Sequence, residues 1–259
     1  GLDYEIRVSQ APGQCREIAA QAARSGKPVR IYACGGDGTL NEIVCGVAGC
    51  PNVAVTTYAG GSGNDFIRMF SQPEAFRNLE KLLDCQESQF NLIRCNEDYA
   101  LNICSVGLDA RIAADVAGYK RFPLFSGFRA YLVSALINTI KGIWQPYTAS
   151  FEKETVQKDF TLICACNGRF YGGGFNPVPE ADPQDGILEV LLVNKVSRLT
   201  VLGLIGAYKK GKYASLPQKI RHIRTNHLHI HSDRPTPLNM DGEIRHIQDV
   251  DISIAPEKL

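Results

Sequence analysis

The sequence predicts an α/β protein in two parts: an N-terminal α/β domain with a parallel sheet and flanking helices, and a mainly β C-terminal domain. Three observations predict this. Up to about residue 90, apolar residues at helical spacing alternate with short buried strands. Beyond it, short strand-like runs are separated by loops rich in Gly, Pro, Asn and Asp. The chain has 259 residues, enough for two modest domains. We therefore divide it into residues 1–90 and 91–259.

The N-terminal elements follow one another in a regular order. Apolar residues between 15 and 22 mark one face of a first helix, and "VRIYAC" follows as a buried strand. Apolar residues between 40 and 47 mark a second helix, and "VAVTT" a second strand. The segment "PEAFRNLEKLLD" is helical in pattern, with Pro73 suited to its first turn. This alternation favours a parallel sheet covered by helices.

The C-terminal elements are mostly strands. The runs "FNLIRC" and "YALNIC" flank the turn-rich "NED", which predicts two strands joined as a hairpin. Further strands are expected at "YTASFE", "FTLICAC", "ILEVLLV", "HLHIH" and "VDISIA". Helices are expected near residues 108–117, 124–143 and 197–210.

Composition and charge exclude several classes of protein. The net charge of +1 gives no reason to expect a nucleic-acid partner. Nine cysteines, scattered and odd in number, do not form a disulfide framework, so we expect reduced thiols in a cytosolic protein. No signal peptide opens the chain. Arg129 and Lys141 interrupt the longest apolar run, which predicts an amphipathic helix there rather than a membrane span.

The segment "ACGGDGTLNEIV" carries the strongest chemical signal. A buried strand runs into glycines and a helix begins at once, so a ligand can approach the backbone and the helix start can hold phosphate. A carboxylate in such an anion site makes sense if Asp37 handles Mg²⁺ or a substrate proton. An ordinary strand-to-helix turn remains the alternative reading. The candidate residues are Gly35, Gly36, Asp37, Gly38, Thr39 and Asn41.

A second glycine-rich turn, "AGGSGNDF", follows the next strand. Ser62 lies among its glycines, and Asp65 comes just before a short helical run. Because the loops after successive parallel strands emerge at the same edge of a sheet, we expect the two turns to line one crevice. Asp65 could also be a plain N-cap for the helix that follows, and the two roles do not exclude each other.

These turns, taken in order with later segments, resemble the bacterial diacylglycerol-kinase-like lipid kinases, a family that also includes sphingosine and ceramide kinases. "GGDGTLNEIV" and "GGSGNDF" carry the first part of the resemblance. It continues through "NICSVGLDARIA", "NGRFYGGGFNPVPEADPQDGILEV" and "LNMDGE", and so covers nearly the whole chain. It implies a nucleotide-binding domain over residues 1–90, a lipid-substrate domain over 91–259, and an active site in the cleft between them.

The resemblance also implies roles for individual residues. The backbone from Gly35 to Asn41 would hold the phosphates of ATP, and Ser62 would contact the nucleotide from the second turn. Asp37, as a catalytic residue, and Asp65 would organise metal and phosphate. Glu243 would act as the general base on the acceptor hydroxyl. A Mg²⁺ site would be formed by Asp182, Asp185 and the backbone of Ile187. The implied cofactors are ATP and Mg²⁺.

The sequence departs from the family pattern in two places. Relatives begin with a strand and an N-P-x-x-G nucleotide loop, whereas this sequence opens close to its first helix, so we expect the N-terminal domain to lack its first strand and loop here. Relatives commonly carry Asp where Asn91 stands, so the function of that carboxylate would be weakened.

We therefore expect an ATP-dependent lipid kinase, with diacylglycerol as the favoured acceptor and phosphatidic acid as the product. Sphingoid bases and other lipids remain open as acceptors. Its partners would be ATP and a lipid at the membrane surface, reached by peripheral association with the inner face, and a homodimer is the default state. Two alternatives stay open: a kinase for a soluble substrate, of the NAD kinase or phosphofructokinase type, and a lipid-binding pseudokinase.

Overall fold

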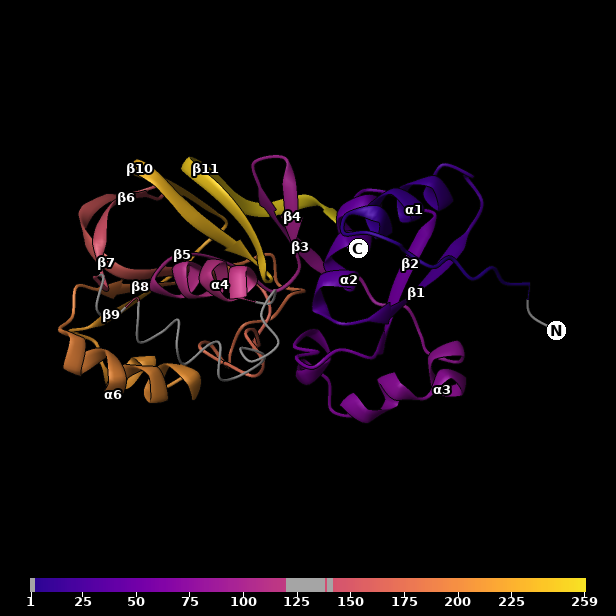
Figure 1. Ribbon diagram of the computed structural model, residues 1–259, viewed down its shortest axis with the longest axis horizontal. Helices are drawn as coiled ribbons and strands as arrows, with labels where there is room; N and C mark the ends of the chain where they lie inside the picture. The colour runs from indigo at the N-terminus through magenta and orange to yellow at the C-terminus, as the bar shows by residue number, and fades with distance from the viewer. Residues whose placement is uncertain (1–2, 120–137, 139–141) are drawn as a thin grey trace.

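The computed structural model describes residues 3–119, 138 and 142–259, and its N-terminal part is the predicted α/β unit. The elements are α1 (Gln14–Ala23), β1 (Val29–Gly35), α2 (Asp37–Val47) and β2 (Val53–Ala59), seen on the right of Figure 1. β1 and β2 pair in parallel, from Val29 opposite Val53 to Gly35 opposite Ala59. Because the strands end in register, the turns that follow them leave the sheet side by side at its carboxyl edge.

The helices α1 and α2 pack against each other and against this sheet. Ala19 of α1 and Val44 of α2 are fully buried, and Ala33 of β1 is 1% exposed. The small residues allow the helix, the neighbouring helix and the strand to approach closely. This packing holds the start of α2 in place at the first glycine turn.

The prediction of one continuous helix from Pro73 is wrong. Past η1 (Phe66–Met69), the segment forms two short pieces, η2 (Pro73–Arg77) and α3 (Leu79–Leu83). Asn78 separates them because its backbone is extended and its side chain accepts a hydrogen bond from the Lys81 backbone N–H, as an N-cap does. The local capping preference of Asn78 ends one helical turn and starts the next.

The C-terminal part is a nine-stranded antiparallel β structure. Its strands run in the order β4-β3-β11-β10-β5-β7-β8-β9, and β6 bridges β10 and β7, so that β10, β5, β7 and β6 close on themselves. The strands are β3 (Asn91–Cys95), β4 (Asp98–Ala100), β5 (Ile103–Gly107), β6 (Gln145–Ser150), β7 (Thr155–Cys166), β8 (Leu188–Asn194), β9 (Ile220–Thr225), β10 (His227–Met240) and β11 (Glu243–Lys258). The helices are α4 (Leu108–Tyr119), α6 (Arg198–Lys209) and the short η3 (Tyr213–Ser215).

Three expectations for this part need comment. The run "YALNIC" is not one strand but two, β4 and β5, because the backbone at Leu101 and Asn102 turns to bond the Asp241 carboxylate. The strand β9 was not expected from the sequence, because it is an edge strand with charged residues between its apolar ones. The helix expected at 124–143 lies outside the described residues, apart from residues 138, 142 and 143.

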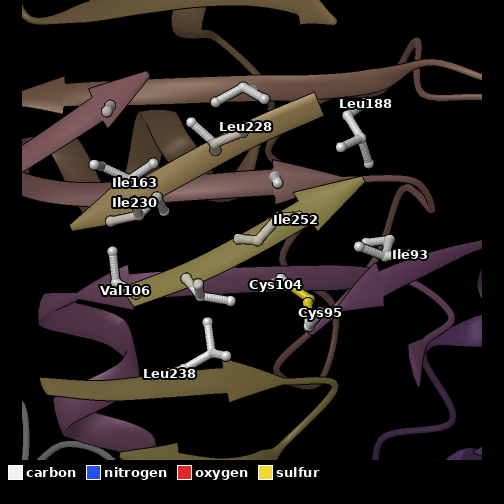
Figure 2. Packing of buried hydrophobic residues seen from close by; sticks show 14 of the residues in the cluster. Ile93, Cys95, Cys104, Val106, Ile163, Leu188, Leu228, Ile230, Leu238 and Ile252 are labelled. Atoms are coloured by element: carbon white, nitrogen blue, oxygen red, sulfur yellow. The ribbon is translucent and has the colours of Figure 1, made fainter. Parts of the chain in front are cut away.

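Two cores lie on the two sides of β7 and β8. The inner core joins side chains from β3, β5, β7, β8, β10 and β11, and Figure 2 shows them converging between the strands. Cys95 and Cys104 meet there with their Sγ atoms 2.7 Å apart. The outer core packs α4 and α6 on the other face and contains the buried thiols of Cys164 and Cys166.

The C-terminal strand joins the two parts. β11 runs back towards α1 and α2, where the C-terminus lies in Figure 1. The backbone of Leu259 exchanges two hydrogen bonds with Phe90, and Ala255 belongs to the same apolar cluster as α1 and α2. Arg16 of α1 also pairs with Asp98 of β4 at 2.8 Å. These contacts place the start of α2 beside the turn between β10 and β11.

Candidate active site

The two glycine turns are bonded to each other. The backbone N–H groups of Gly60 and Gly61 donate to the Gly35 carbonyl at 2.9 and 3.2 Å. A Cβ on Gly61 would collide with the Gly36 Cα, so glycine is required at this contact. Gly36 is the N-cap of α2 and supplies no side-chain cap, which leaves the first N–H groups of the helix available to an anion.

Asn64 gives the second turn its shape. Its backbone is left-handed, with φ 48°, and its side chain bonds Gly61 twice, donating to the carbonyl and accepting from the N–H. The amide therefore closes the turn upon itself. Ser62 is left exposed at the tip, where its hydroxyl is free to meet a ligand.

Asp37 and Asp65 lie together between the turns. The Asp65 backbone N–H donates to Asp37 Oδ1 at 2.6 Å, and a Cβ on Gly63 would come within 2.6 Å of Asp37 Oδ2. Burial raises the pKa of Asp65, and the nearby Asp37 charge adds to the rise. Two carboxylates this close favour a bound cation or a shared proton.

The Asp65 carboxylate does not cap the helical turn that follows it. It instead accepts a hydrogen bond from the Gly173 N–H at 2.8 Å and lies 3.3 Å from Nε of Arg68. Gly172, Gly173 and Gly174 all have positive φ, so this loop of the β part can turn its N–H groups towards the second glycine turn. Asp65 thus connects the two domains.

Glu243 reaches the same place from the far end of the chain. It is the first residue of β11, and its Oε1 lies 3.8 Å from the position of a Cβ on Gly38, in the first turn of α2. The carboxylate therefore faces the helix start that carries Asp37. Glu243 and Asp37 therefore lie at the same junction of the two parts, the place that is proposed below as the catalytic groove.

Of the remaining candidate residues, Thr39 lies at the first glycine turn and Asn41 forms structural contacts. The Thr39 hydroxyl lies directly over Gly35, where a Cβ would collide with it. Asn41 is 5% exposed, and its amide points to the Tyr99 carbonyl at 3.4 Å and to Asp241 at 3.5 Å. Asn41 therefore connects α2 to the β part.

The acidic loop before β8 is an Asx-turn structure. Asp182 Oδ1 accepts from the Gln184 N–H, and Asp185 Oδ1 accepts from the Ile187 N–H. Asp185 also lies 3.3 Å from the Arg224 guanidinium. Both carboxylates are exposed, and Mg²⁺ needs only one or two when water completes its shell. The donor set thus fits a hydrated ion, although Arg224 competes for Asp185. No cluster of three or more acidic, His or Cys ligands occurs in the described ranges.

Asn91 lies under this loop. Its backbone N–H donates to the Pro183 carbonyl at 2.6 Å, and its side chain is buried close to Gly186. Within the part of the chain that the structure describes, its Oδ1 has no hydrogen-bond partner. A buried amide oxygen without a hydrogen-bond donor destabilises the folded state. The polar groups beneath this loop are therefore less completely hydrogen-bonded than those around it.

The sequence analysis missed two acidic residues. Asp241 precedes Glu243 and holds the turn between β4 and β5; its "DG" is a hairpin-turn signal that could have revealed it. Asp109 is the second residue of α4, and burial raises its pKa to about 6. Ser105 donates to it at 2.7 Å and Tyr171 at 3.3 Å.

Asp109 lies in the wall of an apolar hollow between α4, α6, β7 and β8. The hollow is open on one side and encloses about 70 Å³, well below the roughly 300–1,000 Å³ usual for ligand pockets. Its lining is otherwise mostly aliphatic and aromatic, with Leu108, Ile112, Leu162, Phe175, Val193 and Leu204 among the contributors.

Comparison with known proteins assigns a family to each part. Residues 1–95 match the diacylglycerol kinase catalytic domain, and residues 102–259, more than half of the chain, match the YegS C-terminal NAD kinase beta sandwich-like domain. Two Staphylococcus aureus proteins, from strains MRSA252 and Mu3, are named "Putative lipid kinase". Each is 26% identical to this chain over 260 residues, which is 98% of this chain and 84% of theirs.

Solved structures agree on the fold. A crystal structure from Bacillus anthracis, titled as a putative diacylglycerol kinase, superposes with a TM-score of 0.75 at 22% identity. The match covers 95% of this chain and 80% of that one. A second B. anthracis diacylglycerol kinase structure gives a TM-score of 0.68 at 18% identity, with the same coverage. The predicted combination of an α/β domain and a mainly β domain is confirmed.

Proposed function

This chain belongs to the diacylglycerol-kinase-like family that joins a diacylglycerol kinase catalytic domain to a YegS C-terminal domain, and from that premise we propose that it transfers the γ-phosphoryl group of ATP to the hydroxyl of a membrane lipid. The observation that carries the proposal is the approach of Glu243 to Gly38. It brings a carboxylate from the β part to a helix start that can hold phosphate.

The residues at this groove divide the work of phosphoryl transfer. The first N–H groups of α2, with Thr39 and Ser62, bind and align the phosphates. Glu243 accepts the proton of the lipid hydroxyl as that oxygen forms its bond to the γ-phosphorus. The bond from the γ-phosphorus to the leaving oxygen breaks, and ADP departs. Asp37 and Asp65 hold the charge balance of the site.

The nucleotide and metal fit the groove. The glycines at positions 36, 61 and 63 form a cradle that any Cβ would fill, so the backbone is open to a phosphate. Asp37 and Asp65 would supply oxygen ligands of the kind that Mg²⁺ prefers, and the exposed Asp182 and Asp185 with the backbone of Ile187 would hold a supporting ion. When bound, Mg²⁺ would neutralise phosphate charge.

The apolar hollow beside Asp109 supports a lipid acceptor. Its lining is suited to a hydrocarbon chain, and the Asp109 carboxylate and the Tyr171 hydroxyl offer polar groups to a hydroxyl or amine at its wall. Ser105 lies 3.5 Å from Asn239, whose side chain accepts the Gly242 N–H beside Glu243. We favour diacylglycerol as the acceptor.

The enzyme would work on lipid while bound to the membrane surface. No helix in the described residues is both long and apolar enough to cross a bilayer. Leu199, at the start of α6, is 85% exposed, and Lys209 and Lys210 lie at the end of the same helix, beside the hollow. An exposed apolar side chain and basic residues on one helix suit peripheral contact with the anionic inner face.

The test is transfer of radiolabelled γ-phosphate from ATP into a panel of acceptors. The panel contains diacylglycerol, a sphingoid base and extracted bacterial lipids, with NAD and fructose 6-phosphate as soluble acceptors. We expect label in the lipid fraction, with diacylglycerol the best acceptor, and Asp109→Asn should raise KM for lipid with little change in KM for ATP. Label confined to a soluble acceptor would overturn the proposal, and so would ATP binding without transfer to any acceptor.

A further inference from the structure

The Asp241 carboxylate lies in a ring of backbone donors. It accepts hydrogen bonds from three successive N–H groups, those of Leu101 at 2.5 Å, Asn102 at 3.0 Å and Ile103 at 2.9 Å. Successive N–H groups that point at one centre form a concave anion site, and bonds of this kind to a charged acceptor are stronger than neutral ones. We call this set of contacts the Asp241 clamp.

The clamp fixes a tight two-residue turn. Asp241 and Gly242 both have positive φ, 50° and 98°, and they connect Met240 of β10 to its pairing partner Glu243 of β11. This is the backbone that two-residue hairpins favour. The Gly242 N–H donates to Asn239 Oδ1 at 2.8 Å, so the turn is held on a second side. The position of the Glu243 backbone follows directly from this turn.

The clamp also touches the nucleotide domain. Asn41 of α2 donates to Asp241 Oδ2 at 3.5 Å and to the Tyr99 carbonyl at 3.4 Å. The same helix carries Asp37 and Gly38 in its first turn. Asp241 therefore contacts both sides of the groove that Glu243 and Asp37 share.

Resting on the lipid kinase function above, we propose that Asp241 is a positioning residue, which clamps the β10–β11 turn to the β4–β5 turn and to α2 and so holds the Glu243 carboxylate opposite the start of that helix. Asp241 does not touch the reacting atoms. Its charge state is consistent with this role, because all of its partners are donors and favour the ionised carboxylate. Burial opposes them and raises the pKa of Asp241 to about 6, with Asp37 adding to the rise.

The decisive test is a double-mutant cycle with Asp241→Asn and Glu243→Gln. Asp241→Asn keeps the side-chain shape but removes one acceptor oxygen from the clamp. We expect kcat to fall on the order of 10²-fold, as for a misplaced catalytic group, with KM for ATP within about twofold of the wild type. In the Glu243→Gln background the same change should alter the residual kcat by less than about twofold. An equal fold loss in both backgrounds would overturn the proposal.

A matched control and a second variant keep the test interpretable. Asp251→Asn removes a carboxylate from β11, where Asp251 pairs with the half-buried His227 and His229, and should leave kcat unchanged. Gly242→Ala strains the positive-φ position without crowding, since no heavy atom lies within 4 Å of its Cβ. It should show the same dependence on Glu243 if Asp241→Asn does not fold.

Hydrogen exchange provides a readout that needs no activity. The amides of Leu101, Asn102 and Ile103 should exchange faster in Asp241→Asn than in the wild type, and at the wild-type rate in Asp251→Asn. Normal exchange in Asp241→Asn would overturn the clamp whatever the activity. A wild type that phosphorylates nothing yet shows the exchange difference would instead overturn the proposed function, and with it the catalytic consequence of the clamp.

Discussion

Replacing Gly61 by alanine should force the two glycine turns apart. A Cβ at Gly61 would lie closer than 3.0 Å to the Gly36 Cα, 3.2 Å from the Gly36 nitrogen and 3.0 Å from Asn64 Oδ1. Two of these atoms belong to the backbone and cannot rotate away, so the turns must separate by several tenths of an ångström or more. That movement strains both hydrogen bonds to the Gly35 carbonyl.

The cost follows from these contacts. Overpacking costs about 1–3 kcal/mol, and each weakened hydrogen bond about 1 kcal/mol, so we expect the free energy of unfolding to fall by about 2–4 kcal/mol. Phosphates held between the turns would be misplaced, so kcat should fall on the order of 10²-fold.

Gly60→Ala is the matched control. A Cβ at Gly60 has no neighbour nearer than 3.8 Å, which is an ordinary contact, so this variant should stay within about 0.5 kcal/mol of the wild type. Urea denaturation and the kinase assay would be run on both variants. If Gly61→Ala matched Gly60→Ala in free energy of unfolding and in kcat, the close approach of the turns would contribute to neither, and the reasoning would be refuted.

Three further outcomes are expected. Burial raises the pKa of Asp109 from 3.8 to about 6, so its contribution to stability is complete below the unfolded pKa and is lost as pH rises through 6. From about pH 4.5 to about pH 7.5, wild type should lose ~2 kcal/mol more unfolding free energy than Asp109→Asn in urea titrations, and equal losses would contradict this. Gly203→Ala, at an exposed and uncrowded position of α6, should raise the free energy of unfolding by about 0.5–1 kcal/mol, measured by urea denaturation. A decrease would mean that the helix is strained there. In thiol titration, Cys34 and Cys85 should react in the native protein, and early reaction of the buried thiols would contradict their packing. Those that should react only on unfolding are Cys95, Cys104, Cys164 and Cys166.

The parts of the site that sequence could predict are those that depend on neighbouring residues. Glycines between a buried strand and a helix mark the first turn, and Asp37 stands out because an acid at a phosphate-binding helix start needs a chemical reason. The second turn was predictable for the same reason, since parallel pairing of β1 and β2 brings the two loops to one edge.

The parts that could not be predicted depend on contacts between distant segments. Asp65 bonds Gly173, 108 residues away, and Asp241 bonds Leu101, 140 residues away. No local pattern shows such pairs. The interruption of "YALNIC" has the same cause, because the backbone that would have continued the strand bonds to Asp241. Glu243 was identified through the family resemblance, since an acid in a "DGE" turn looks like an ordinary surface residue until α2 lies opposite it.

The most direct test of the account is the Glu243→Gln variant, measured for both nucleotide binding and phosphoryl transfer. Glutamine keeps the shape of the side chain but cannot accept the proton of the lipid hydroxyl. ATP should bind at wild-type affinity, with transfer to lipid reduced on the order of 10²–10⁴-fold. Transfer within a few fold of wild type would remove Glu243 as the base and would contradict the claim that the groove between α2 and β11 is where the reaction occurs.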